Sequence, residues 1–169
     1  MAIPLRRLRE SAQRPRITVA KSLTEARELG IRTAFLCHSH IDRDIVLGFV
    51  RELSEAGWRI YVDWLDPSLP EKPDRHTASK IKDRIRRANF FIFLATPNSV
   101  KSRWCPWEIG YADGVKPIDS IFVVPTEDGA GTYGNEYLDL YRRIDFSNQG
   151  RLASWMPGNF NNGTIVSNL

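Results

Sequence analysis

Short apolar runs alternate with amphipathic segments along this chain, and this alternation is what most limits its fold. The largely apolar runs are residues 33–37, 58–62, 90–95 and 120–124. They predict buried strands, because a strand covered on both faces lacks polar alternation. Apolar positions spaced by three and four predict helices over residues 42–57, 77–88 and 102–114. Strands that alternate with helices predict an α/β fold whose central sheet is parallel, with right-handed crossovers.

The ends of the chain carry weaker signals. Tyr141–Asp145 predicts a fifth, short strand, so the sheet has about five, and residues 127–134 predict a glycine-rich loop. Ser22 and Glu25 form a capping box that opens a short helix. We therefore expect residues 1–30 to be a basic N-terminal arm, loosely docked before that helix, and residues 31–146 to form the main domain. Residues 147–169 are expected to be a tail that packs on or extends it, with a brief helical piece near residues 152–155.

Composition narrows the class of protein. A chain of 169 residues predicts one domain. No apolar run approaches the roughly 20 residues that span a bilayer, and the N-terminus lacks the apolar core of a signal peptide. We therefore expect a cytoplasmic protein without membrane contact, in which Cys37 and Cys105 are reduced thiols. A net charge of +4 without a basic–aromatic or helix-turn-helix motif gives no reason to expect a nucleic-acid partner.

Three segments follow predicted strands and should meet at one edge of the sheet. They are residues 37–41, 63–74 and 96–103. In open α/β sheets, ligands bind beyond the carboxyl ends of the strands, where the strand order reverses. The second segment contains three prolines, which exclude a helix or a central strand. A loop of this length is often functional.

Glu108 is the acid best placed for chemistry, near the start of the helix that follows the third segment. The positive end of a helix dipole favours an ionised carboxylate. Trp104 lies four residues earlier and shares its helix face. Spacing alone also allows a second interpretation, in which Ile109, Trp107 and Tyr111 pack on the sheet and Glu108 is a solvated or dipole-pairing acid.

Other candidate sites are weaker. Cys37, His38, Ser39 and His40 offer a thiol, two imidazoles and a hydroxyl, but no third ligand stands at a metal-binding spacing, so we expect no metal centre. The sequence has neither the glycine fingerprint of dinucleotide dehydrogenases nor a Walker A loop. Asp63, at the end of the second strand, could contact a ribose hydroxyl or form a turn.

Three blocks in order resemble a Toll/interleukin-1 receptor (TIR) domain of the bacterial kind. They are residues 34–42 (AFLCHSHID), 57–64 (GWRIYVDW) and 102–111 (SRWCPWEIGY). The last resembles the family's Trp-x-x-x-Glu segment, and the comparison covers about residues 31–145. The resemblance implies a flavodoxin-like three-layer α/β fold.

The resemblance also implies an activity, namely cleavage of NAD at the nicotinamide N-glycosidic bond in bacterial antiphage immunity. NAD would be the substrate, with no resident cofactor, and the product would be ADP-ribose or a cyclic form of it. Glu108 would be catalytic. The residues expected to contact substrate are Cys37, His38, Ser39, Asp63, Trp64, Arg75 and Trp104. The loop at residues 64–75 would gate the pocket and mediate self-association, and an effector protein could be a partner.

Two alternative functions stay open. A non-catalytic TIR module would recruit partners through the same loop and the basic helix over Lys80–Arg87. A nucleoside N-glycosidase or deoxyribosyltransferase resembles this fold and also uses a glutamate.

Overall fold

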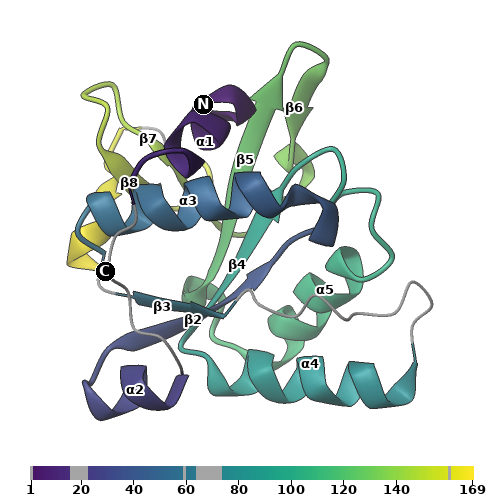
Figure 1. The fold of residues 1–169 in the computed structure, drawn as a ribbon. Helices are drawn as coiled ribbons and strands as arrows, with labels where there is room; N and C mark the ends of the chain where they lie inside the picture. Colours follow the sequence, from purple (N-terminus) through teal and green to yellow (C-terminus); the bar gives the residue numbers. More distant parts are fainter. Residues whose placement is uncertain (1, 16–22, 59, 64–73, 160) are drawn as a thin grey trace.

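The computed structural model describes residues 2–15, 23–58, 60–63, 74–159 and 161–169. A central sheet separates two helical layers (Figure 1). Helices α1 (Leu5–Ala12) and α3 (Arg43–Glu55) cover one face, and α4 (Arg75–Arg87) and α5 (Cys105–Val115) cover the other. The predicted three-layer α/β fold is confirmed.

Five parallel strands form the middle of the sheet. Their spatial order is β3 (Ile60–Asp63), β2 (Arg32–Cys37), β4 (Phe90–Ala95), β5 (Ile121–Asp128) and β7 (Arg142–Phe146). Numbered along the chain, this order is 2-1-3-4-5, the flavodoxin-like arrangement. The strand order reverses between β2 and β4, so a ligand is expected beyond the carboxyl ends of these two strands.

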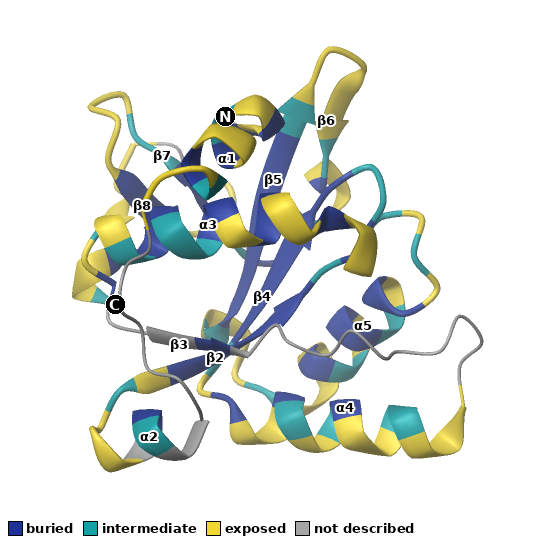
Figure 2. Cartoon of the chain, viewed as in Figure 1, coloured by how far each residue is buried: buried dark blue, intermediate teal, exposed yellow. Residues whose placement is uncertain are grey.

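Both faces of the sheet are buried, which explains the continuous apolar runs (Figure 2). In β4, Ile92 and Leu94 belong to the core beneath α1 and α3, whereas Phe91 and Phe93 belong to the core beneath α4 and α5. The alternation along a single strand thus supplies two separate hydrophobic cores.

The N-terminal residues pack closely, and the expected loose arm is wrong for residues 2–15. Strand β1 (Ile3–Pro4) pairs in parallel with β5, and α1 packs on α3. Gly48 allows this contact, because a Cβ built there would lie 1.8 Å from the carbonyl oxygen of Leu8. The predicted short helix is present as α2 (Leu23–Glu28), while its predicted cap, Ser22, lies outside the described residues.

The C-terminal residues add strands rather than the predicted helical turn. β8 (Leu152–Trp155) pairs antiparallel with β7, and β9 (Thr164–Ile165) pairs antiparallel with β8. All four residues of β8 are buried, so sheet pairing and packing override the weak helical pattern. Within the predicted glycine-rich loop, β6 (Gly131–Tyr133) folds back on the end of β5.

Short 3₁₀ turns complete the fold. They are η1 (His40–Asp42), η2 (Ile118–Ser120), η3 (Asn135–Tyr137) and η4 (Val166–Asn168). None of the helices in the described part of the chain is long and apolar enough to cross a membrane.

Candidate functional site

The loops that follow β2 and β4 are joined at the switch point by one buried acid. Asp42 accepts a hydrogen bond from the Thr96 hydroxyl and another, of 2.6 Å, from the Asn98 amide. It occupies the predicted position before α3, but its side chain does not cap that helix. The carboxylate instead holds together two loops that are 54 and 56 residues apart in sequence.

The start of α5 is fixed by Ser102, as its sequence position predicts. The Ser102 hydroxyl accepts hydrogen bonds from the backbone amides of Trp104, at 3.1 Å, and Cys105, at 3.4 Å. Pro106 lies in the first turn, where its missing N–H costs no helix bond. Glu108 is then held in the same turn with its side chain directed into the protein, where it is 3% exposed. The interpretation of Glu108 as a solvated acid is therefore wrong.

Two thiols surround the carboxylate of Glu108. The sulfur atoms of Cys37 and Cys105 and a carboxylate oxygen all lie within 4.8 Å of one another. The Cys37 sulfur is also 3.8 Å from the carbonyl oxygen of Cys105. Both cysteines are free and buried.

This environment shifts the protonation of Glu108. Burial raises its pKa to about 7, and the hydrogen bond from the Cys37 thiol opposes that rise. Burial likewise raises the pKa of Cys37 well above its usual value, so the thiol stays protonated. A cationic group brought beside Glu108 would favour its ionised form. The site is thus suited to stabilise positive charge that develops on a bound molecule.

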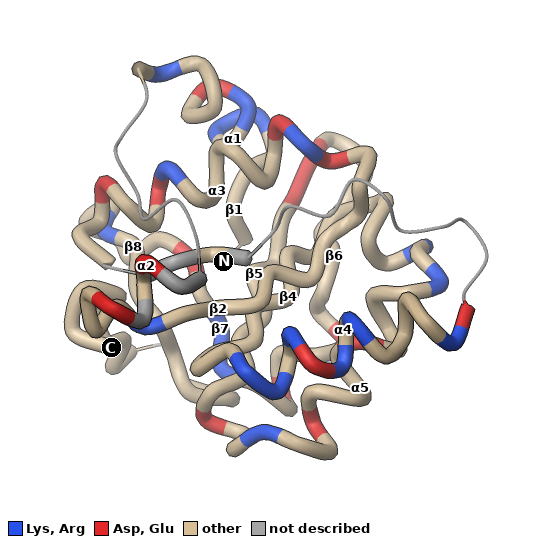
Figure 3. Tube along the Cα trace, turned by 60° about the horizontal axis from the view of Figure 1, so that its bottom comes forward, with Lys and Arg blue, Asp and Glu red and all other residues tan. Residues whose placement is uncertain are grey.

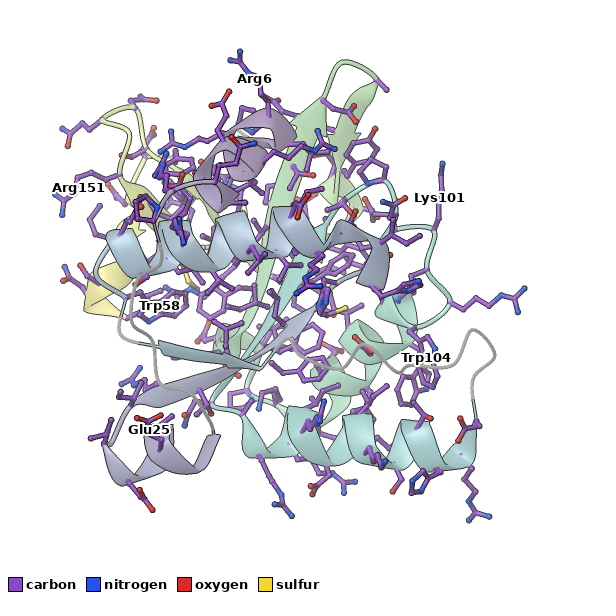
Figure 4. All side chains as sticks on the ribbon, viewed as in Figure 1. Arg6, Glu25, Trp58, Lys101, Trp104 and Arg151 are labelled. Atoms are coloured by element: carbon purple, nitrogen blue, oxygen red, sulfur yellow. The ribbon has the colours of Figure 1, made fainter. Side chains whose placement is uncertain are left out.

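A row of aromatic rings continues outward from the site. Trp104 meets Trp107 edge to face, with ring centroids 5.6 Å apart, and Trp107 stacks on Tyr111 at 5.9 Å. The amine of Lys82 lies over both outer rings, between α4 and α5. Trp107 and Tyr111 are partly buried and pack against the core beneath α4 and α5, so this part of the second interpretation holds. Trp104, at the entrance to α5 (Figure 4), is buried at 9% exposure, and its contact with substrate stays a prediction.

The predicted residues after β2 lie beside this cluster in sequence and are partly buried. His38 is half-buried, and its Nδ1 is 2.8 Å from the carbonyl oxygen of Leu36. Burial lowers the pKa of His38, which favours the neutral ring. Ser39 is buried, and its carbonyl oxygen accepts a hydrogen bond from the Asp42 amide.

The remaining predicted residues come from β3 and the segment after it. Asp63 ends β3 with its backbone opposite Phe35, while its side chain is not described. Trp64 and the segment up to residue 73 lie outside the described residues. Arg75 is exposed and opens α4, which Asp74 caps through the amides of His76 and Thr77. Of the predicted site residues, Cys37 thus lies directly beside Glu108. Substrate contacts of Asp63 and Trp64 stay predictions.

Two features of the site differ from what the sequence predicts. The sequence predicts only a reduced thiol at Cys105, although Cys105 lies three residues before Glu108 and therefore shares its helix face. The Asp42 bridge could have been suspected, because polar residues follow both β2 and β4 and the ends of neighbouring parallel strands meet. Its partners could not be chosen from the sequence.

A flavodoxin-like sheet with a desolvated acid at its switch point defines a class of α/β domains with a ligand site at the carboxyl edge. More specifically, this chain belongs to the TIR domain family, because the family model described as "TIR domain" matches residues 34–154. The resemblance in the three sequence blocks is therefore confirmed.

Two bacterial proteins are similar in sequence. "Probable 3' cyclic ADP-D-ribose synthase ThsB'" of Bacillus cereus (strain MSX-D12) is 34% identical over 110 residues, which cover 63% of this chain and 57% of that protein. "Putative cyclic ADP-D-ribose synthase TIR2" of Cytobacillus dafuensis is 27% identical over 81 residues, covering 46% of this chain and 21% of that protein. The matches span less than two thirds of the length of either relative.

Proposed function

We propose that this TIR domain consumes NAD by breaking the bond between nicotinamide and ribose. The observation that carries the proposal is the desolvated carboxylate of Glu108 at the switch point of the sheet. The names of the two relatives support it, because both are described as cyclic ADP-D-ribose synthases. Glu108 belongs to the Trp-x-x-x-Glu segment that carries the family resemblance.

The chemistry needs one carboxylate and no acid. When the ribose C1′–N bond breaks, its electron pair goes to the pyridinium nitrogen, and nicotinamide leaves as a neutral molecule. The ribose that remains has oxocarbenium character, and ionised Glu108 stabilises that charge in a site where water does not weaken the attraction. Attack by water gives ADP-ribose and a proton. Attack by a hydroxyl of the same molecule gives a cyclic ADP-ribose and a proton.

The other residues serve binding in this proposal. Cys37, His38 and Ser39 border the ribose at the end of β2, and Asp63 contacts a ribose hydroxyl. Trp104 lies against a ring of the substrate, an interaction worth about 1 kcal/mol. NAD is a substrate here, and the proposal requires no resident cofactor.

The cellular role follows from the activity. We propose that the enzyme acts in the cytoplasm in bacterial antiphage defence and that its product serves an effector protein. Self-association through residues 64–75, including Trp64 and Arg75, would accompany activity. Assays therefore need a range of protein concentrations.

The central test compares two buried glutamates. NAD loss and products are followed by chromatography at high protein concentration for the parent, Glu108→Gln and Glu52→Gln. The Glu108 variant preserves shape and should lose about 10²–10⁴-fold in rate, which is typical for a positioned catalytic group. Glu52, on α3, is the matched control and should keep the parent's rate. Cleavage by Glu108→Gln at the parent's rate would contradict the proposal.

The same assay separates the alternative functions. A non-catalytic module would assemble without NAD loss at any protein concentration. A nucleoside N-glycosidase would release bases from nucleosides offered beside NAD and leave NAD intact.

A further inference from the structure

We propose that Cys37, Cys105 and Glu108 form a Zn²⁺ site. Two thiolates and one carboxylate are ligands that zinc prefers, with a water molecule left to complete a tetrahedron. Among the described residues, this is the place where three His, Cys, Asp or Glu side chains converge on one point. Sequence spacing does not predict this site, because Cys37 lies 68 residues from Cys105.

The geometry is close to what zinc requires. The three ligand atoms lie within 4.8 Å of one another. In a tetrahedral site with Zn–S of about 2.3 Å and Zn–O of about 2.0–2.2 Å, ligand atoms are roughly 3.4–3.8 Å apart. Closing the site therefore needs a contraction of about 1 Å, which side-chain rotation can supply.

Rigid elements hold the ligands in position. Cys37 is the last residue of β2, and Cys105 and Glu108 share the first turn of α5. A spacing of three residues directs the two helical side chains to the same side. All three side chains are at most 3% exposed, so little conformational entropy is left to lose when the metal binds.

The charge balance also favours a divalent cation. Binding to ionised Glu108 and two thiols releases two protons, because zinc ligates the thiolate form of cysteine. From ionised Glu108, one Zn²⁺ thus replaces two protons, and the total charge of the cluster does not change. From protonated Glu108, a third proton leaves, and the cluster gains one negative charge.

The histidines of the same loop do not form this site. The Nδ1 of His38 faces the carbonyl oxygen of Leu36 instead of the thiols. His40 is exposed in η1. Both lie near the cluster in sequence, so they provide matched controls for it.

Zinc binding has a consequence that rests on the proposed function. A metal ion bound to Glu108 takes away the carboxylate that would stabilise the ribose cation. Zn²⁺ should therefore inhibit NAD cleavage, and a chelator should restore it.

The binding test does not depend on activity. The reduced full chain is titrated with Co²⁺ to equilibrium, which allows for slow access to buried ligands, and Zn²⁺ is then added as a competitor. We expect a sulfur-to-cobalt charge-transfer band, with an intensity that corresponds to two thiolates, and its loss on adding Zn²⁺. The chain has only two cysteines, so this band reports on the parent without any variant.

Variants then assign the ligands. Cys37→Ser and Cys105→Ser should weaken Co²⁺ and Zn²⁺ binding by at least the roughly 10–100-fold that loss of an outer partner costs. His40→Gln should bind as the parent does. Circular dichroism of each variant checks that it folds.

The outcomes separate this inference from the proposed function. Absence of a thiolate band in the parent, or unchanged binding by a folded Cys37→Ser, would overturn the zinc site. Zinc binding with no NAD cleavage by metal-free protein would keep the site and overturn the function. Inhibition that persists in Cys105→Ser would overturn this site as the cause of inhibition.

Discussion

Two glutamates of this domain are equally buried and differently surrounded. Glu52, on α3, is 5% exposed, and its carboxylate contacts Arg7 at 3.3 Å, Arg14 at 3.6 Å and the Ser11 hydroxyl. Glu108, on α5, is 3% exposed and has a thiol as its hydrogen-bonding partner. Among the described residues, no cation lies within ion-pair distance of it.

The difference separates an acid that links two helices from the acid to which the proposed function assigns the chemistry. Burial of a charge is costly unless the charge is paired and hydrogen-bonded, and Glu52 satisfies that rule by linking α1 to α3. Glu108 breaks the rule at the edge of the sheet where ligands bind. Exceptions of this kind concentrate at functional sites, because the interaction that is missing is left for the substrate to supply.

The basic residues follow the same division. Figure 3 shows lysines and arginines along α4, beside α5. Two of them, Lys82 and Arg86, lie over the rings of the outer aromatic row. On the other face, Arg7 on α1 and Arg14, just after that helix, reach the buried Glu52 directly. The number of basic residues near a buried acid therefore does not show whether the acid is paired, because that depends on where each basic side chain lies.

The largest expected effect is a stability change of opposite sign for the two acids. Burial raises the pKa of Glu108 to about 7 in the folded state, against an ordinary value of 4.5, so the folded state holds the proton more tightly. Its contribution is fully present below pH 4.5 and is lost as pH rises through 7, by up to about 3 kcal/mol. Glu108→Gln should therefore raise the free energy of unfolding at pH 8 and change it little at pH 5.

Glu52→Gln provides the opposite case. It should lower the free energy of unfolding by about 1–2 kcal/mol at both pH values, a modest loss because Arg7 and Arg14 still reach water. Urea unfolding at the two pH values measures both effects. A Glu108→Gln protein that is less stable than the parent at pH 8 would contradict the unpaired state of Glu108.

The second prediction uses the same pKa in catalysis. If ionised Glu108 stabilises the ribose cation, kcat/KM for NAD should fall about tenfold per pH unit below 7, and roughly a hundredfold between pH 7 and pH 5. Above pH 7 it should level off. The residual rate of Glu108→Gln should lack this step. If kcat/KM of the parent did not change from pH 5 to pH 8, ionisation of Glu108 would not control the rate of NAD cleavage.

Sequence reasoning found the strands and the catalytic candidate because both depend on local signals. The runs at residues 33–37 and 90–95 are largely apolar throughout, because both faces of each strand are buried. Glu108 was found from the block around it. The burial of Glu108 could not be predicted, because residue spacing shows which helix face the side chain shares but not which residues cover that face.

The errors arose where distant partners decide the structure. Leu5 and Leu8 are too few to predict a packed helix, and α1 is stable because Gly48 lets it approach α3. Leu152–Trp155 is a strand because β7 offers a free edge. Neither partner can be recognised from the short segments themselves.

The third prediction concerns Asp42, a buried acid that has more hydrogen-bonding partners than Glu108 but, unlike Glu52, no ion pair among the described residues. Asp42 is 4% exposed and is satisfied by two neutral donors, Thr96 and Asn98. Asp42→Ala leaves both donors unpaired and should lower the free energy of unfolding by about 2 kcal/mol. Because the two loops border the site, KM for NAD should rise as well. Asn98→Ala removes a single bond and should cost about half as much, and equal losses in urea unfolding would argue against a shared bridge.

The smallest effect tests how much of the pairing of Glu52 is redundant. Arg14 is 43% exposed, lies 3.6 Å from Glu52 and also pairs with Glu55. Water screens such pairs, and Glu52 keeps Arg7 and Ser11, so Arg14→Gln should cost only about 0.5 kcal/mol. Added salt should reduce the difference further. Ser11→Ala, which removes a buried hydroxyl donor, should cost more, about 1 kcal/mol. Urea midpoints could instead rank Arg14→Gln as the more damaging change. In that case the ion pair stabilises buried Glu52 more than its hydrogen bond to Ser11 does, and Glu52 and Glu108 differ mainly in whether a cation lies beside them.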